Sequence, residues 1–184
     1  PMSSVSTLTG ITLATTGGYD GFLVKLTKDG EYQWHKTFSG TGDEQVRDVT
    51  TDLEGNLIVA GTFEGNLKIN GAPIVINGET VDISSKGAID GFIAKFDTNG
   101  TLKFILSIGG IGADNAYSVT TDINNDIYAT GSAAFGSTRT ISVGNYDFTT
   151  GIGTGVHTWL GKFDAINGNV LWAKAALSSS NQQQ

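Results

Sequence analysis

The chain has 184 residues, of which 39% are hydrophobic, 26 are glycine and 2 are proline. This apolar fraction permits a packed core, and the many glycines favour strands joined by tight turns. The net charge of −7 argues against a nucleic acid partner, the absence of cysteine excludes disulfides and thiolate metal sites, and no apolar run is long enough for a membrane helix.

The first residues of the chain, 1–19, are expected to be the end of a preceding repeat unit, called a blade below, or of a segment inserted into that unit. Two runs of alternating apolar and polar residues follow within 20–38, with the period of a β-strand. The sequence KDG separates them and predicts a turn, because Gly30 can adopt a positive φ. Further strand-like runs at 45–51 and 57–63 complete a unit of four short strands, and the last of them, LIVAGTF, is apolar enough to be buried on both faces.

This unit returns along the chain. Without any gap, 12 of the 44 positions in residues 20–63 are identical in residues 90–133, and a weaker third copy follows. Lys25, Lys95 and Lys162 mark the same place in the three copies, at spacings of 70 and 67 residues. Four antiparallel strands that recur radially are typical of a β-propeller blade, whereas a solenoid is the competing interpretation.

The prediction is an all-β protein of four-stranded antiparallel blades in an incomplete ring. Residues 20–38 would supply the outer strands of a partial blade, and two full blades with long insertions would follow, at 39–109 (insertion about 64–88) and at 110–177 (insertion about 134–156), before a polar tail at 178–184. The insertions are expected to protrude, the first with a hairpin of LKIN and PIVIN behind which ETVDI pairs. Because a propeller needs about four to eight blades, we expect either a longer chain or identical chains that complete one another.

Several motifs resemble a known family. The run DGFIAKFDTNGTLKF, the loop GGIGAD and the run DINNDIYATGS resemble the SBBP type of bacterial β-propeller repeat, and NGNVLWAK is similar to a strand of quinoprotein-type propeller repeats. The resemblance covers residues 20–174 and implies blades of a large secreted or surface protein, with no catalytic residues. The first copy departs from the pattern at SGTGDE, where serine replaces a glycine.

Aromatic residues occupy two fixed positions of the repeat. We expect them to pack between neighbouring blades rather than to form a platform for a ligand. The predicted packing residues are Phe22, Phe92 and Trp159 at one position, and Trp34, Phe104 and Trp172 at the other.

Few residues suggest chemistry. His35 and His157 lie at non-equivalent repeat positions without the spacing of metal ligands, and Asp52 and Asp122 are expected to accept backbone hydrogen bonds at the start of turns. No cofactor is predicted, except that Ca²⁺ is a weak possibility in acidic loops that should share one end of the blades with the insertions. The weak metal candidates are Asp43, Glu44 and Asp114, with solvated loops as the alternative.

The functional prediction is a non-catalytic β-propeller module in an extracellular, cell-surface or virion-surface protein. Its expected partner is a protein or another copy of itself, for scaffolding or self-assembly in an adhesin-like protein, an appendage or a filament. A glycan-binding propeller is one alternative, which requires exposed aromatic residues beside amides at equivalent positions; Tyr117 and Tyr146 are not matched between copies. A fragment of a propeller enzyme is the second alternative.

Overall fold

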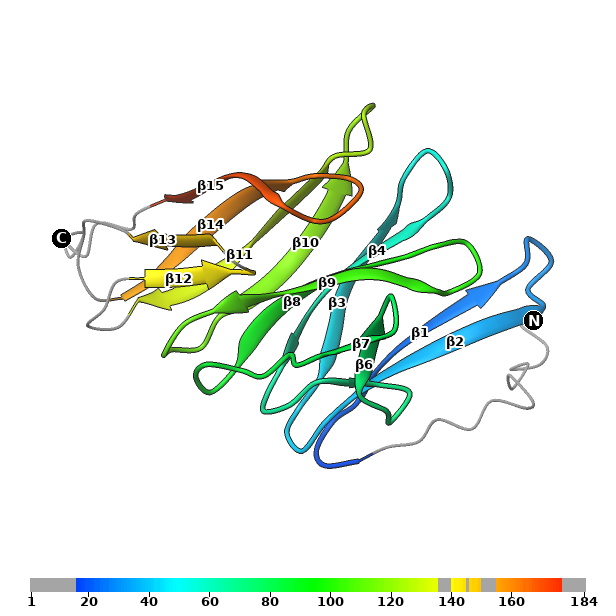
Figure 1. Ribbon diagram of the computed structural model, residues 1–184, viewed down its shortest axis with the longest axis horizontal. Coiled ribbons are helices and arrows are strands. Elements are labelled where there is room, and N and C mark those ends of the chain that lie inside the picture. The colour runs from blue at the N-terminus through cyan, green and yellow to red at the C-terminus, as the bar shows by residue number, and fades with distance from the viewer. Residues whose placement is uncertain (1–15, 136–139, 145, 150–154, 177–184) are drawn as a thin grey trace, which may run out of the picture.

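The computed structural model describes residues 16–135, 140–144, 146–149 and 155–176, so most of the N-terminal segment and the polar tail lie outside the described residues. The strands form three antiparallel sheets side by side, with a separate small hairpin (Figure 1). The first blade contains β1 (Gly21–Leu26) and β2 (Tyr32–Ser39). The second contains β3 (Gln45–Thr51), β4 (Leu57–Phe63), β8 (Asp90–Phe96) and β9 (Leu102–Gly109). The third contains β10 (Asn115–Thr121), β11 (Ile127–Phe135), β14 (Gly155–Phe163) and β15 (Val170–Ala176).

The prediction of an all-β protein with four-stranded antiparallel blades is confirmed. Within the second and third blades the strands pair in the order of the chain, β3–β4–β8–β9 and β10–β11–β14–β15. Every residue of β4 is buried, as its apolar run predicted, because sheets pack against both of its faces. The described residues form an open row of blades rather than a closed ring (Figure 1).

Aspartates fix the tight turns between strands. The Asp52 carboxylate accepts hydrogen bonds from the backbone N–H groups of Glu54 and Asn56, at 3.1 and 2.8 Å. Asp122 makes the same pair of bonds in the third blade, at 2.8 and 3.0 Å, so the role predicted for both residues is confirmed. These bonds set where each strand ends and therefore which side chains face the neighbouring blade.

The insertions differ from the prediction. The hairpin lies between β6 (Ile74–Ile76) and β7 (Glu79–Val81), so the pairing of ETVDI with PIVIN is confirmed, whereas a hairpin of LKIN and PIVIN is wrong. The residues before it form β5 (Lys68–Ile69), which pairs with β2 of the preceding blade. The next insertion repeats this arrangement, since β12 (Thr140–Val143) pairs with β9 and carries β13 (Tyr146–Thr149). The insertions were expected to protrude, but several of their apolar residues, such as Leu67 at 2% exposure, are buried in the cluster that contains Phe38 of the preceding blade.

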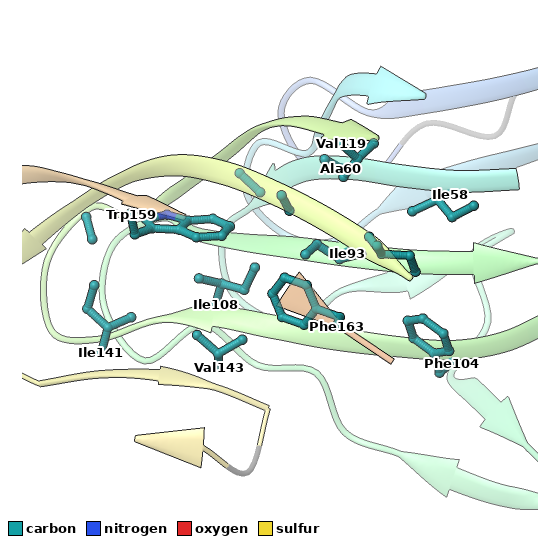
Figure 2. Packing of buried hydrophobic residues seen from close by; sticks show 14 residues of the cluster. Ile58, Ala60, Ile93, Phe104, Ile108, Val119, Ile141, Val143, Trp159 and Phe163 are labelled. Atoms are coloured by element: carbon teal, nitrogen blue, oxygen red, sulfur yellow. The ribbon is translucent and has the colours of Figure 1, made fainter. Parts of the chain in front are cut away.

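Two hydrophobic clusters fill the spaces between the blades. One lies between the first and second blades, and its aromatic members include Phe38, Phe63 and Phe92. The other lies between the second and third blades, where Trp159 and Phe163 pack with Ile93 and Ile108 (Figure 2). Each cluster uses side chains from both sheets, so a blade depends on its neighbour for its core.

Candidate interaction surfaces at the blade junctions

The first aromatic repeat position differs in burial from blade to blade. Phe92 and Trp159 are 0% exposed, whereas Phe22 is 55% exposed. The two buried rings lie against glycines of the adjacent inner strand, because a Cβ atom at Gly61 would be 2.5 Å from the Phe92 ring and one at Gly131 would be 2.7 Å from Trp159 Nε1. Phe22 lacks such a neighbour in the described residues, because β1 pairs only with β2 and not with an inner strand.

The second aromatic position contacts the turn of the next blade. A Cβ atom at Gly100 would lie 3.1 Å from the Trp34 ring, and one at Gly168 would lie 2.7 Å from the Phe104 ring. Trp172, on the last strand, packs within its own blade instead, edge-on to Tyr128 with 6.0 Å between ring centroids. Four of the six predicted packing residues therefore lie between blades, while Phe22 and Trp172 lie on the two outer faces of the row.

A lysine at the same place in each blade contacts a turn between strands, and Lys95 joins two such turns. Lys95 Nζ forms an ion pair with Asp52 at 2.9 Å, in which the two side chains are 7% and 0% exposed, and it also donates to Ala165 O of the third blade at 2.7 Å. Burial disfavours the charged form of Asp52, but hydrogen bonds from Lys95 and Asn56 outweigh this effect, so its pKa lies below the ordinary value. In the third blade, Lys162 pairs with Asp122 and Asp126 at 3.1 and 2.9 Å.

This lysine is expected to matter for stability. The Lys95→Met variant should lower the free energy of unfolding by about 3 kcal/mol, because it leaves the buried Asp52 carboxylate without its cation. The matched control is Lys103→Met, which removes a partly exposed ion pair with Asp97 and should cost less than about 1 kcal/mol. Urea denaturation of both variants measures the difference, and equal losses would contradict a special role for the buried pair.

Two of the three metal candidates in the acidic loops have buried side chains. Glu44 and Asp114 are both 0% exposed, at equivalent positions of the repeat. Asp114 accepts bonds from the backbone N–H groups of Gly110 at 2.6 Å and Ala134 at 2.8 Å, and Asp43 accepts one from Tyr19 N at 2.9 Å. These carboxylates thus hold the loops that join one blade to the next. No group of three or more His, Cys, Asp and Glu in the described residues is placed to hold a metal ion.

Each buried loop carboxyl faces a second carboxyl at the start of a strand. Burial, and then the charge of Asp20, raises the pKa of Glu44 to about 7. Burial likewise raises the pKa of Asp90 to about 6, and the charge of Asp114 adds to the effect. The Asp114 pKa is itself raised by burial. Two ionised carboxylates repel each other, and neither can donate a hydrogen bond to the other. Each pair is therefore most stable when one member holds a proton.

The two histidines lie on different blades, His35 on β2 and His157 on β14. His35 Nδ1 lies 2.8 Å from the Tyr32 hydroxyl on the exposed part of β2. His157 is 4% exposed and stands at the repeat position of Asp20 and Asp90, five residues before the bridging lysine. This equivalence was missed in the sequence, although the offset of 67 residues that aligns Lys95 with Lys162 also aligns Asp90 with His157.

One polar groove lies on the outer side of the second and third blades. Its volume is about 600 Å³, and its lining includes Tyr146, Asp82 and Asn169. Tyr146 and Tyr117 are 45% and 47% exposed but lie on different elements, β13 and β10. The groove thus has an aromatic residue and an amide in its lining, but not at the equivalent repeat positions that the glycan-binding alternative requires.

The fold and the junctions define a repeat protein of propeller-like blades. No protein-family model matches the chain. It is similar to an uncharacterized WD repeat-containing protein of Acanthamoeba polyphaga mimivirus, with 27% identity over 171 residues, which covers 89% of this chain and 12% of the relative. The chain therefore spans about an eighth of that relative's length. This similarity supports a propeller-type repeat, while membership of the SBBP family stays a prediction. In the part of the chain that the structure describes, no helix is long and apolar enough to cross a membrane.

Proposed function

We propose that this chain is a non-catalytic, propeller-type protein-interaction module whose first blade is completed by strands of a partner. The observation that carries the proposal is the burial at one repeat position, where Phe22 is 55% exposed while Phe92 and Trp159 are fully buried. An exposed large ring at a position that elsewhere belongs to the core marks a surface suited to a protein contact. The similarity to a WD repeat-containing protein is consistent with an interaction role.

The strand edge beside Phe22 has the chemistry for such a contact. In the other blades the equivalent strand lies between two partners, since β8 pairs with β4 and β9, and β14 with β11 and β15. Among the described residues, β1 pairs with β2 alone, and no described strand lies beside its inner edge. A depression of about 550 Å³, lined by Tyr19, Phe22 and Val46 among others, adjoins this edge. A partner strand can add to the edge through backbone hydrogen bonds while its side chains meet Phe22.

The internal repeats also specify the side chains of the partner. Gly61 and Gly131 lie against the aromatic rings of the neighbouring strand, so the partner strand should carry glycine opposite Phe22. We include scaffolding and self-assembly in the proposal because a blade of the same repeat type meets this requirement. A secreted or surface location is included because the SBBP resemblance implies it.

A peptide of residues 44–64, which contains β3, its turn and β4, tests the proposal. We expect the labelled peptide to bind the full chain with a dissociation constant of about 1–100 µM, measured by fluorescence anisotropy. The control peptide carries Gly61→Val, whose side chain would collide with the aromatic ring, and it should bind at least about tenfold more weakly. Equal binding of the two peptides, or no binding of either, would contradict the proposal.

A further inference from the structure

The two internal junctions share a repeated set of contacts. From the first blade to the second, Lys25 Nζ donates to Thr98 O at 2.7 Å. From the second blade to the third, Lys95 Nζ donates to Ala165 O, also at 2.7 Å. Both acceptors lie in the turn that precedes the outer strand of the next blade. A further junction between blades of this type is therefore expected to contain the same lysine-to-carbonyl hydrogen bond.

The same turns receive an aromatic side chain from the preceding blade. Trp34 lies against Gly100 and Phe104 against Gly168, at distances that leave no room for a larger residue at either glycine. Both glycines have positive φ, 81° and 73°, so the turn and the contact each favour glycine. A junction of this type needs a bridging lysine and an aromatic ring on one side, and a glycine turn on the other.

Within the described residues, the two outer faces of the row each carry one of these halves, and no described blade supplies the other half. On the first blade, Gly30 has a φ of 84° and no atom within 4 Å of its Cβ position, although it is the repeat equivalent of Gly100. On the third blade, Trp172 is the equivalent of Phe104, and Leu160 is 43% exposed where Ile93 of the second blade is 0% exposed.

The charges of the two faces also match. Lys174 on the third blade is exposed and is the repeat equivalent of Lys36. Lys36 Cε lies 3.2 Å from the Cβ position of Gly100, so this side chain reaches the turn of the next blade. The turn at Gly30 carries Asp29 and Glu31; Asp29 already forms an exposed ion pair with Lys28 at 2.9 Å, so Glu31 is the residue that would receive the Lys174 ammonium group.

From these matches we infer that a second copy of this chain is the partner, and that its third blade docks head to tail onto the first blade. This inference rests on the proposed function, that of a protein-interaction module, and adds a second contact to it: the third blade covers the face of the first blade that carries Phe22 and Gly30, whereas the strands of the proposed function pair with the edge of β1. In the docked pair, Lys162 and Trp172 of one copy would meet the turn at Gly30 of the other, as Lys95 and Phe104 meet the turn at Gly168. Because the two faces differ, the contact is heterologous and each copy keeps one face for a further copy.

Light scattering of the full chain over a range of concentrations tests the inference. We expect the mass to rise above the 19.2 kDa monomer between about 10 and 500 µM. The Leu160→Glu and Phe22→Glu variants each place a charge on one of the two faces, so each should stay monomeric. An equimolar mixture should form dimers and nothing larger, because each pair of copies retains one intact junction. The control is Leu53→Glu at a turn position that is 76% exposed, which should assemble like the unmodified chain.

A chain that stays monomeric throughout, or a variant mixture that fails to dimerise, would overturn the second copy as partner. Assembly of the two variants to the same extent as the unmodified chain would overturn the head-to-tail geometry. Lys174→Glu, at an exposed position, provides an additional check and should weaken association several-fold. The peptide test is independent of these outcomes: a monomeric chain that still binds the 44–64 peptide loses only the second copy as partner, whereas failure of both tests removes the proposed function as well.

Discussion

The Phe92→Ala variant is expected to lower the free energy of unfolding by about 3–5 kcal/mol, whereas Phe22→Ala should lower it by less than about 1 kcal/mol. The two residues occupy the same repeat position and lose the same atoms. Phe92 is fully buried, with ring centroids 5.0 Å from Phe38 and 6.4 Å from Phe63, so its removal leaves a cavity between two blades. Phe22 is 55% exposed and leaves no comparable cavity.

Guanidinium denaturation followed by tryptophan fluorescence measures both free energies on the same chain. The pair is a matched comparison, because the neighbouring residues Gly21 and Gly91 are also identical in the two copies. The Trp159→Ala variant provides a second buried example and should resemble Phe92→Ala. A loss at Phe22 as large as that at Phe92 would mean that the first blade already has a packed neighbour, which would contradict the open blade on which the proposed function depends.

The sequence predicts the blades because local and repeated signals agree. The alternation in β1, the apolar run of β4 and the aspartate–glycine turns each specify a strand or its end without reference to the rest of the chain. The ungapped repeat of residues 20–63 at 90–133 adds that the units must pack in the same way. Together these signals identify both the four-stranded sheets and the aromatic positions that face a neighbouring blade.

The role of the insertions could not be predicted in the same way. β5 has two residues, and β12 makes only two pairs with β9, so neither run is long enough to show a strand period. Their pairing depends on the outer strand of the previous blade, about 30 residues earlier in the case of Phe38 and Ile69. A contact between residues so far apart in the chain leaves no pattern in the local sequence. The insertions therefore look like protruding loops in the sequence although they close the edge of a sheet.

The burial of Glu44 is a second property that could not be predicted from the sequence. Glycine-rich acidic loops usually lie in solvent, and SGTGDE fits that expectation. In the structure, the backbone N–H of Glu44 donates to Tyr19 O at 2.6 Å, which brings the loop onto the start of β1 and turns the carboxyl inward toward Asp20. The equivalent bond from Asp114 N to Ile89 O, at 2.7 Å, does the same at the next junction. The sequence contains both residues of each pair, but only the sheet register places them together.

These carboxyl pairs lead to a pH dependence whose sign is fixed by the direction of their pKa shifts. In the unfolded chain Glu44 and Asp90 release their protons near the ordinary values of 4.5 and 3.8, but in the folded chain near about 7 and about 6. Between these values the folded state binds more protons, so stability falls as the pH rises through the folded pKa values. At the acid end, Asp48 and Asp52 have lowered pKa values, and their contribution is lost as the pH falls below about 3.8.

We therefore expect the melting temperature to be higher at pH 5 than at pH 8. The Glu44→Gln variant should raise the free energy of unfolding by up to about 3 kcal/mol at pH 8 and by less than about 1 kcal/mol at pH 5, because glutamine has the shape of the protonated acid and cannot ionise. The control is Glu79→Gln on the exposed strand β7, which removes one charge without touching a junction. Thermal melts of the three proteins at both pH values measure the effect. Stability that rises from pH 5 to pH 8, or a Glu44→Gln variant that is less stable than the unmodified chain at pH 8, would show that the folded state prefers the ionised carboxylate, in which case another group at this junction must balance its charge.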